Sequence, residues 1–284
     1  MSTAVSSRLL LLAAALLFST GGAAIKAADL SGWQVAAFRS GVAAAALLAL
    51  APGARRGWSW RVAPVGLAYA GTLLLFVLAN KLTTAANAIF LQDTAPLYLL
   101  ILGPLLLGEP VRRRDAPFVA AVLAGIALFF VGQAPATRTA PDPLRGNLLA
   151  SAAGVSWALT IAGLRWLGSR PGTTAAMPAV AAGNLLVFIG CLPPALPVSA
   201  LRWQDVAVIA YLGVFQIALA YECLTRGLAR VPALEASLLL LLEPALNPVW
   251  AWLMHGERPG GFAVAGGALI LGACLLKTWR EQSS

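Results

Sequence analysis

The sequence predicts an all-helical integral membrane protein whose ten transmembrane helices form two inverted five-helix repeats. Of its 284 residues 60% are apolar and only 11% are charged, and the mean hydropathy is +0.81. Long apolar runs recur along the whole chain, and the second half repeats a pattern of the first. A water-soluble domain of this length would need far more polar surface, and one or two spans would leave most of this hydrophobicity unexplained.

Ten apolar segments have the length that a bilayer requires, about 17 to 23 residues for a hydrocarbon core of about 30 Å. The first begins at Arg8, and clusters of Gly, Pro and Arg separate several of the others, as in APGARRG, QAPATRTAPDPLRG and SRPG. We expect the first segment, which resembles a secretory signal, to be retained because its removal would break the repeat. The segments cover residues 8–28, 33–52, 62–81, 86–106, 116–132, 145–168, 173–193, 204–226, 233–254 and 260–278.

Lys and Arg are distributed unequally between the two sides of this ten-span chain. If the N-terminus is cytoplasmic, thirteen of the twenty basic residues are inside, six are outside, and Arg39 lies within the second span. The positive-inside rule therefore predicts that both termini are cytoplasmic. This topology also explains the pI of about 10.3, so we do not expect a nucleic-acid partner.

The chain contains an internal duplication. Residues 86–110 align with residues 234–258 at a constant offset of 148, and the matches include Ala88 with Ala236, Leu91 with Leu239, Pro96 with Pro244, and Gly108-Glu109 with Gly256-Glu257. This predicts a first five-helix repeat at 1–133, an external linker at 134–144 and a second repeat at 145–284. An odd number of spans per repeat inverts the second copy, a construction that recurs in secondary transporters with a central site.

These features resemble the drug/metabolite transporter superfamily, specifically its EamA-type members. The resemblance is carried by the Gly-Glu pair that closes the fourth span of each repeat, the Pro-bearing fourth span, and the internal glycine of the next span, Gly125 or Gly272. The segments NKLTTAANA and GLARVPALEAS are most similar to those of bacterial exporters of aromatic amino acids and paraquat. The resemblance implies a ten-helix inner-membrane carrier with cytoplasmic termini and a cavity formed chiefly by the third, fourth, eighth and ninth spans.

Helical periodicity in those four spans brings polar and aromatic residues onto shared faces. Such faces fit a mixed substrate cavity better than a lipid surface. The alternative is that the polar groups bond between helices and the aromatic residues lie at the membrane interface. The predicted cavity residues are Tyr69, Thr72, Phe76, Asn80, Asn87, Thr94, Tyr98, Tyr211, Phe215, Glu222, Glu243, Asn247 and Trp250.

Four prolines are predicted to interrupt the two repeated spans. An ionised carboxylate at mid-span costs about 2.5–3.5 kcal/mol on insertion scales, so Glu243 should face protein or water. Pro96 and Pro244 would deprive the carbonyls of Gln92 and Leu240 of their helical donors. We expect Pro96, Pro104, Pro244 and Pro248 to act as hinges that also expose polar groups to substrate, although static kinks are the alternative.

The other charged residues allow several roles. Glu222 and Asp93 could contact substrate, but Glu222 could instead pair with Arg226 one turn along the same helix. Glu109 and Glu257 lie at span ends, where capping or gate contacts are expected.

The basic residues in and near the spans also allow more than one role. Lys26 and Arg39 could offset these acids or attract a carboxylate, and we expect Lys26 to extend to the outer surface. We expect His255 at the membrane interface. Isolated cysteines at 191, 223 and 274 indicate neither a disulfide nor a metal site.

The sequence favours a transporter over other classes of membrane protein. It contains no HExxH, Gly-x-Ser-x-Gly or P-loop motif and no recognisable ion filter, so neither an enzyme nor a channel is expected, and facilitated diffusion or proton exchange remain as mechanisms. We expect a monomer without a cofactor that exports hydrophobic and aromatic amino acids. The alternatives are export of other metabolites or of aromatic cationic drugs, or a receptor.

Overall fold

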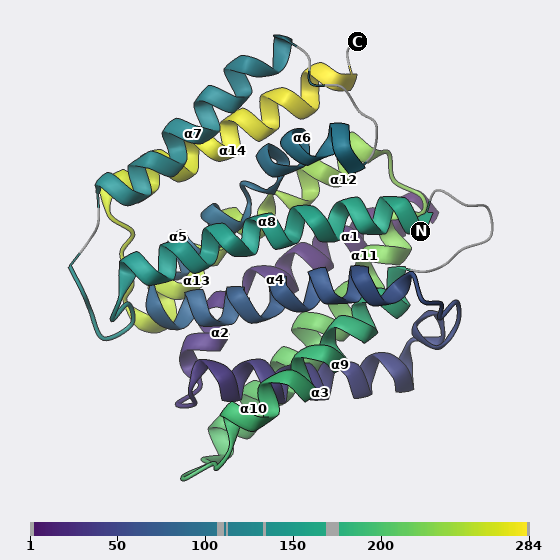
Figure 1. The fold of residues 1–284 in the computed structure, drawn as a ribbon, viewed down its shortest axis with the longest axis vertical. Coiled ribbons are helices and arrows are strands. Elements are labelled where there is room, and N and C mark those ends of the chain that lie inside the picture. Colours follow the sequence, from purple (N-terminus) through teal and green to yellow (C-terminus); the bar gives the residue numbers. More distant parts are fainter. Residues whose placement is uncertain (1–2, 107–110, 112, 133–134, 169–175, 283–284) are drawn as a thin grey trace.

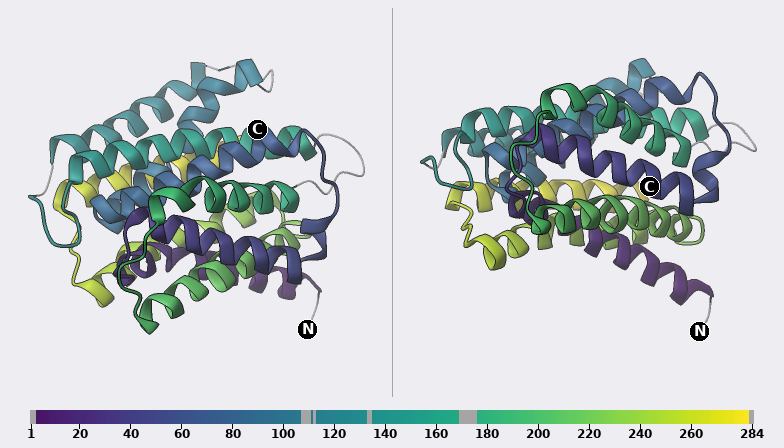
Figure 2. Two further views of the ribbon diagram at one scale, coloured as in Figure 1. Left: turned by 60° about the horizontal axis from the view of Figure 1, so that its bottom comes forward. Right: turned by 90° about the horizontal axis from the view of Figure 1, so that it is seen from below.

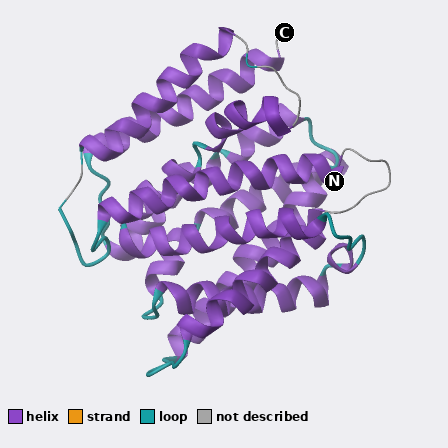
Figure 3. Cartoon of the chain, viewed as in Figure 1, coloured by secondary structure: helices purple, strands orange, loops and turns teal. Residues whose placement is uncertain are grey.

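The computed structural model describes residues 3–106, 111, 113–132, 135–168 and 176–282, which are helical apart from short connections (Figures 1 and 3). The elements in chain order are α1 (Thr3–Ser19), α2 (Gly21–Ala27), α3 (Gly32–Leu50), η1 (Pro52–Arg55), α4 (Val62–Leu82), α5 (Ala85–Gln92), α6 (Ala95–Leu106), η2 (Arg113–Asp115), α7 (Ala116–Val131), α8 (Pro143–Gly168), α9 (Ala176–Ala195), α10 (Trp203–Tyr211), the π-helix η3 (Leu212–Leu219), α11 (Ala220–Leu228), α12 (Ala233–Leu240), α13 (Leu242–His255) and α14 (Gly261–Gln282).

Helices long and apolar enough to cross a bilayer account for most of the chain. Among the described residues there are eight of them, at Ser6–Ala27, Gly32–Leu50, Val62–Leu82, Ala85–Leu106, Pro143–Leu167, Ala176–Ala195, Trp203–Leu228 and Gly261–Arg280. Helix α7 is a shorter apolar helix, and α12 and α13 follow each other across residues 233–255. The prediction of an all-helical membrane protein is therefore confirmed.

Helices from the two halves of the chain pack against each other. The most extensive pairings join α4 to α8, α3 to α9, α4 to α9, α7 to α14 and α1 to α11, and α5 packs against α13. In Figure 1 the α7–α14 pair forms the upper edge and α3 with α9 lies near the lower edge, while α4 and α8 cross the middle. Figure 2 shows the same bundle from two other directions. Each half therefore buries its apolar surface largely against the other.

Small residues allow these helices to approach closely. A Cβ added to Gly125 of α7 would lie 3.0 Å from the Gly266 carbonyl oxygen of α14, and one added to Gly266 would lie 2.8 Å from the Gly125 oxygen. Lipid tails are as apolar as the helices, so tight van der Waals contact at small residues is a main source of helix association in a bilayer. Gly272, the counterpart that the sequence suggested for Gly125, has open space at its Cβ position.

Two helix breaks occur where the sequence predicted them. Helix α5 ends at Gln92 and α12 ends at Leu240, the residues whose carbonyls lose their donors to Pro96 and Pro244. Helices α6 and α13 by contrast continue through Pro104 and Pro248. The matched breaks thus interrupt equivalent points of the fourth and ninth predicted spans.

Two further irregularities were not predicted. The first predicted span is divided between α1 and α2, and at the break the hydroxyls of Ser19 and Thr20 donate to the carbonyls of Leu16 and Leu17, each at 2.7 Å. Such bonds compete with the helical pattern and bend helices. In the eighth predicted span the π-helix η3 adds residues to the turn, which rotates the faces on either side of it relative to each other.

The two ends of the helix bundle can be told apart by the chain termini. In Figure 1 the first residues of α1 and the connection 51–61 lie on the right, and the last residues of α14 lie at the upper right. We call this the termini end. The connections 28–31, 83–84, 135–142, 196–202 and 256–260 lie at the other end, which we call the far end.

Candidate functional site

A cavity of about 290 Å³ lies in the middle of the bundle, between the two halves of the chain. Its walls come from both halves, chiefly from α4, the α5–α6 break, α8, η3 with α11, and the α12–α13 break. The residues that line this central cavity are Phe18, Arg39, Tyr69, Thr72, Leu73, Phe76, Gln92, Asp93, Ala95, Pro96, Trp157, Ile161, Gln216, Ile217, Tyr221, Leu224, Leu240, Leu241, Glu243, Pro244, Leu271 and Cys274.

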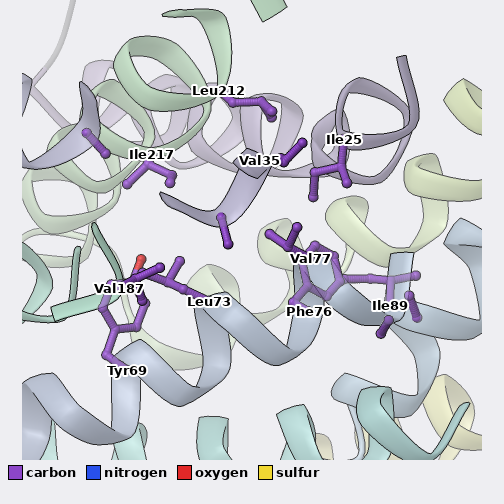
Figure 4. Packing of buried hydrophobic residues seen from close by; sticks show 14 of the residues in the cluster. Ile25, Val35, Tyr69, Leu73, Phe76, Val77, Ile89, Val187, Leu212 and Ile217 are labelled. Atoms are coloured by element: carbon purple, nitrogen blue, oxygen red, sulfur yellow. The ribbon is translucent and has the colours of Figure 1, made fainter. Parts of the chain in front are cut away.

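One face of α4 supplies a continuous part of the wall. Tyr69, Thr72 and Phe76, which the sequence placed on one helical face, all line the cavity together with Leu73. Figure 4 shows Tyr69, Leu73 and Phe76 projecting from the same side of α4 toward Ile217 and Val35. The fourth residue of that predicted face, Asn80, lies one turn beyond the cavity and donates to the Phe76 carbonyl at 2.9 Å.

The two helix breaks bring carboxyl groups into the cavity. Asp93 follows the last residue of α5, and Glu243 lies in the first turn of α13, directly before Pro244. Both line the cavity with the prolines Pro96 and Pro244. Each break therefore places an acidic side chain beside a point where the main chain is irregular. Glu243 was among the predicted cavity residues, and Asp93 was considered as a further substrate contact.

Arg39 brings the opposite charge to the same cavity. Arg39 lies in the middle of α3 and is only 1% exposed, and its Nη2 donates to the Leu73 carbonyl at 3.1 Å. Its Nε has no hydrogen-bond partner. Among the described residues that line the cavity it is the only cation, and none of the described ion pairs includes it.

Aromatic rings form much of the remaining wall. Tyr221 of α11 makes edge contacts with Phe18 and Tyr69, with ring centroids 5.1 and 5.5 Å apart. Trp157 of α8 lines another part of the wall. Such rings offer apolar faces and edges to a bound solute. None of Phe18, Trp157 and Tyr221 was predicted as a cavity residue.

The eighth span, which contains the π-helix η3, contributes residues to the cavity other than those predicted. Regular spacing placed Tyr211, Phe215 and Glu222 on the cavity face, but the residues that line it are Gln216, Ile217, Tyr221 and Leu224. Gln216 follows the predicted Phe215 by one position, Tyr221 precedes the predicted Glu222 by one, and Leu224 follows Glu222 by two. Phe215 is 47% exposed on the outside of the bundle, and Glu222 forms an ion pair with Arg226, the alternative that its sequence position allowed.

The remaining predicted cavity residues lie outside the cavity lining. Asn87 donates to Asn147 Oδ1 at 3.0 Å, Thr94 is buried and donates to the Leu91 carbonyl, and Tyr98 is half-buried on α6. The Asn87 contact follows the alternative in which polar groups bond between helices.

Two further predicted residues contact the first span. Trp250 Nε1 donates to Ser19 Oγ at 2.9 Å, and the Tyr211 hydroxyl lies 2.8 Å from Thr20 Oγ1. Asn247 is fully buried, and a Cβ added to Gly22 would lie 2.6 Å from its Oδ1. Bulkier residues at 22 would therefore force α2 and α13 apart.

A buried ion pair lies at the far end of the bundle. Lys26 Nζ lies 2.9 Å from Glu257 Oε1, with side chains 3% and 4% exposed, although the geometry at this oxygen is not that of a hydrogen bond. Lys26 also donates to the carbonyls of Thr83 and Thr139, and Glu257 Oε2 accepts from the Ala85 amide at 3.0 Å. We call these five residues the far-end cluster. The prediction that Lys26 extends to the surface is wrong, because its partner Glu257 lies far away in the sequence.

Two other predictions concern this end of the spans. His255, expected at the interface, has its Nε2 2.8 Å from the Ala23 carbonyl oxygen and is half-buried. Gly108 and Glu109, the counterparts of Gly256 and Glu257 in the first half, lie outside the described residues.

A bundle of membrane-spanning helices around a central polar and aromatic cavity defines a membrane protein of the carrier class. Residues 6–131 and again residues 144–279 match the EamA-like transporter family, so the chain belongs to this family.

Known relatives and a solved structure are similar to most of the chain. Threonine/homoserine exporter RhtA of Salmonella typhimurium strain SL1344 is 27% identical over 220 residues, which are 75% of this chain and 69% of that protein. The protein of the same name from Escherichia coli strain K12 is 28% identical over 202 residues, 68% of this chain and 62% of that one. A crystal structure with 22% identity superposes with a TM-score of 0.62 over 98% of each chain, which supports the fold.

Proposed function

We propose that this chain is a secondary transporter that exports amino acids and related small metabolites through the central cavity by alternating access. The observation that carries the proposal is that one cavity between the two halves combines carboxyl groups, a guanidinium and aromatic rings. A few placed polar groups in an otherwise apolar pocket are typical of small-molecule sites. The cavity volume of about 290 Å³ is at the lower end for such sites, which suits one small solute.

The aromatic wall favours hydrophobic and aromatic amino acids as substrates. Tyr69, Phe76, Trp157 and Tyr221 can contact an apolar side chain, whereas the charged groups can orient the ammonium and carboxylate that all amino acids share. An apolar pocket discriminates poorly between side chains that differ by one methylene, about 1–3 kcal/mol each, so we expect a broad substrate range.

The relatives support a second candidate within the same class. The proteins named threonine/homoserine exporter would export amino acids with short polar side chains. Thr72 and Gln216 line this cavity and could hydrogen-bond a side-chain hydroxyl. Threonine and homoserine therefore belong in any panel of test substrates.

Two inverted five-helix repeats, at 1–133 and 145–284 with a linker at 134–144, would explain the helix pairing. Exchanging the halves turns the α4–α8 pair into the α1–α11 pair and returns α3–α9, α7–α14 and α5–α13 to themselves. The family also matches the chain twice. A pseudo-two-fold arrangement of this kind lets one half rock against the other around a central site.

The far-end cluster supports a state in which the cavity communicates with the termini end. Among the cavity residues, Tyr69 of α4 and Leu224 of α11 lie nearest that end of their helices, whereas the cluster joins α2, the α4–α5 and α7–α8 connections, and the residues after α13 at the opposite end. With both termini in the cytoplasm of a bacterial inner membrane, as the basic residues indicate, this state would receive substrate from the cytoplasm. Release would require the far-end cluster to separate.

Counterflow into liposomes tests this function. Liposomes that contain purified protein and a high internal concentration of unlabelled phenylalanine should accumulate labelled phenylalanine at a saturable rate. Competition should come from tryptophan, methionine, leucine or threonine, and protein-free liposomes are the control. Transport restricted to sugars or nucleotide-linked metabolites would overturn the proposed substrate class, and aromatic amines that compete better than amino acids would favour drug export.

A further inference from the structure

The guanidinium of Arg39 is a buried cation that lacks a carboxylate partner. It lines the central cavity from α3, and Leu73, which accepts its one described hydrogen bond, lies on α4. Lys26, another buried cation of the described chain, has the carboxylate of Glu257 at 2.9 Å. Arg39 differs because its Nε has no partner at all.

An unpaired guanidinium in the middle of a membrane span would be stabilised by an anion. A charge at the middle of a membrane span is costly, by about 2.5–3.5 kcal/mol on insertion scales, and such residues usually pair with one another or mark a substrate path. A neutral backbone carbonyl satisfies one donor of the planar fork but supplies no opposite charge. A guanidinium holds a carboxylate by two parallel hydrogen bonds, which a backbone carbonyl cannot offer.

The acidic side chains of the same cavity do not supply this anion. Asp93 and Glu243 line the cavity, yet no described ion pair within 4.0 Å connects either of them to Arg39. The cavity thus holds separated groups of opposite charge. A solute with an ammonium at one end and a carboxylate at the other matches this separation, whereas a simple amine matches only half of it.

We propose that Arg39 binds the carboxylate of the amino-acid substrate and thereby makes that carboxylate a requirement for binding. This inference rests on the proposed function and adds to it a specificity-determining residue. It separates two substrate classes that share aromatic side chains: zwitterionic amino acids are accepted, and aromatic cations without a carboxylate are rejected. Asp93 and Glu243 receive the ammonium in this arrangement.

A ligand series on the wild-type protein tests the carboxylate requirement without any substitution. The unlabelled competitors of phenylalanine counterflow are phenylalanine itself, its methyl ester and phenethylamine. The ester and the amine keep the ring and the amino group but lack the free carboxylate. We expect the ester and the amine to compete at least about tenfold more weakly, the range for a lost hydrogen bond to a charged group. Equal competition by all three would overturn the proposal.

Substitution of Arg39 provides the complementary test. In Arg39→Gln the apparent affinity for phenylalanine should fall by about 10- to 100-fold while competition by phenethylamine is unchanged or stronger. Arg39→Lys should retain part of the affinity, because the charge remains but the planar fork is lost. Arg226→Gln is the matched control, since Arg226 pairs with Glu222 outside the cavity.

The outcomes separate this inference from the proposed function. If the ligand series shows the carboxylate requirement but Arg39→Gln leaves the ratio of phenylalanine to phenethylamine affinity unchanged, Arg39 is not its source and the inference is wrong. If Arg39 only held α3 to α4, its loss would weaken both ligands equally, which also contradicts the inference. If wild-type protein binds and transports no amino acid, the proposed function itself is wrong.

Discussion

Glu243 and Asp93 place two acidic groups beside the helix breaks at the centre of the molecule. Neither takes part in an ion pair of the described chain, in contrast to Glu222, Glu235 and Glu257. A carboxylate in such a position is available to a bound ammonium group or to a proton. Binding of the substrate's amino group should therefore be tested at these two carboxyl groups.

Glu243→Gln keeps the shape of the side chain and removes its charge. We expect transport of phenylalanine at low substrate concentration to fall by at least about tenfold, the effect of losing one charge-assisted hydrogen bond. The rate of counterflow in liposomes measures this. Glu222→Gln is the matched control, because that glutamate pairs with Arg226 away from the cavity and its loss should leave the rate within about twofold. A wild-type rate for Glu243→Gln would remove it from the binding site.

Single residues were predictable where a regular helix carries them. Tyr69, Thr72 and Phe76 share a face of α4 that no break disturbs, and periodicity was sufficient to group them. Tyr221 was missed because the cavity face of the eighth span, which contains the π-helix, differs from the face that the regular spacing of Tyr211, Phe215 and Glu222 indicated. Lys26 was misjudged because its distance to Glu257 depends on the tertiary fold, which local sequence does not reveal.

At the scale of helices, the breaks before Pro96 and Pro244 are the points where the two halves can bend. Removing a proline restores a backbone donor, so Pro96→Ala and Pro244→Ala should extend α5 and α12 and stiffen them. We expect several-fold slower counterflow with normal insertion and an unchanged elution profile in size-exclusion chromatography. Pro104→Ala and Pro248→Ala are matched controls within continuous helices, and we expect smaller effects from them. Equal rates in all four variants would identify the breaks as static kinks.

The far-end cluster is the contact that must separate for substrate to leave at that end. Removing one member of a buried ion pair strands the other charge, at a cost of about 3–5 kcal/mol, so the double variant Lys26→Met with Glu257→Met is the better test. We expect this variant to open the far end more often. Cys274, which lines the cavity, should then react several-fold faster with a membrane-impermeant thiol reagent added from the far-end side.

The control for the far-end variant is Lys81→Met. Lys81 lies at the same end and donates to the Ala28 carbonyl, but no described ion pair contains it. All cysteine experiments use Cys191→Ala with Cys223→Ala as background, which leaves Cys274 as the single thiol. If labelling from the far-end side is the same in wild type, in Lys81→Met and in the double variant, the cluster is not a gate.

Some of the helix irregularities could be predicted from the sequence and others could not, for a physical reason. Proline removes a donor wherever it occurs, which indicated the breaks at Gln92 and Leu240, but α6 and α13 continue through Pro104 and Pro248, so a proline alone does not determine where a helix breaks. The break between α1 and α2 depends on the hydrogen bonds of the Ser19 and Thr20 hydroxyls to main-chain carbonyls. Serine and threonine also occur in many unbroken membrane helices, so these residues did not indicate a break. The π-helix has no comparable residue signal.

For the whole molecule, the asymmetry of basic residues predicts both termini in the cytoplasm and the connection around 135–142 outside. In intact cells, a cysteine introduced at Thr137 should react with a membrane-impermeant thiol reagent, and a cysteine in place of Gln282 should react only after the membrane is disrupted. The opposite pattern would contradict the predicted topology.

The duplication allowed the helical class and the order of the spans to be predicted, but not their packing. Apolar faces surround nearly every helix of this chain, so hydrophobicity alone does not indicate which helices pair. The pairing of α4 with α8 and of α7 with α14 depends on where glycines such as Gly125 and Gly266 permit close approach. The cavity depends on that packing, so helical periodicity could not predict most of the residues that line it.

The reactivity of Cys274 with and without substrate tests most directly whether the central cavity binds amino acids. With the protein in liposomes and Cys274 as the single thiol, labelling from the termini-end side should slow at least several-fold in saturating phenylalanine and should not change with phenethylamine. Protection by phenylalanine would show that an amino acid occupies this cavity. An unchanged labelling rate in saturating phenylalanine, tryptophan, methionine, leucine and threonine would contradict the proposed site.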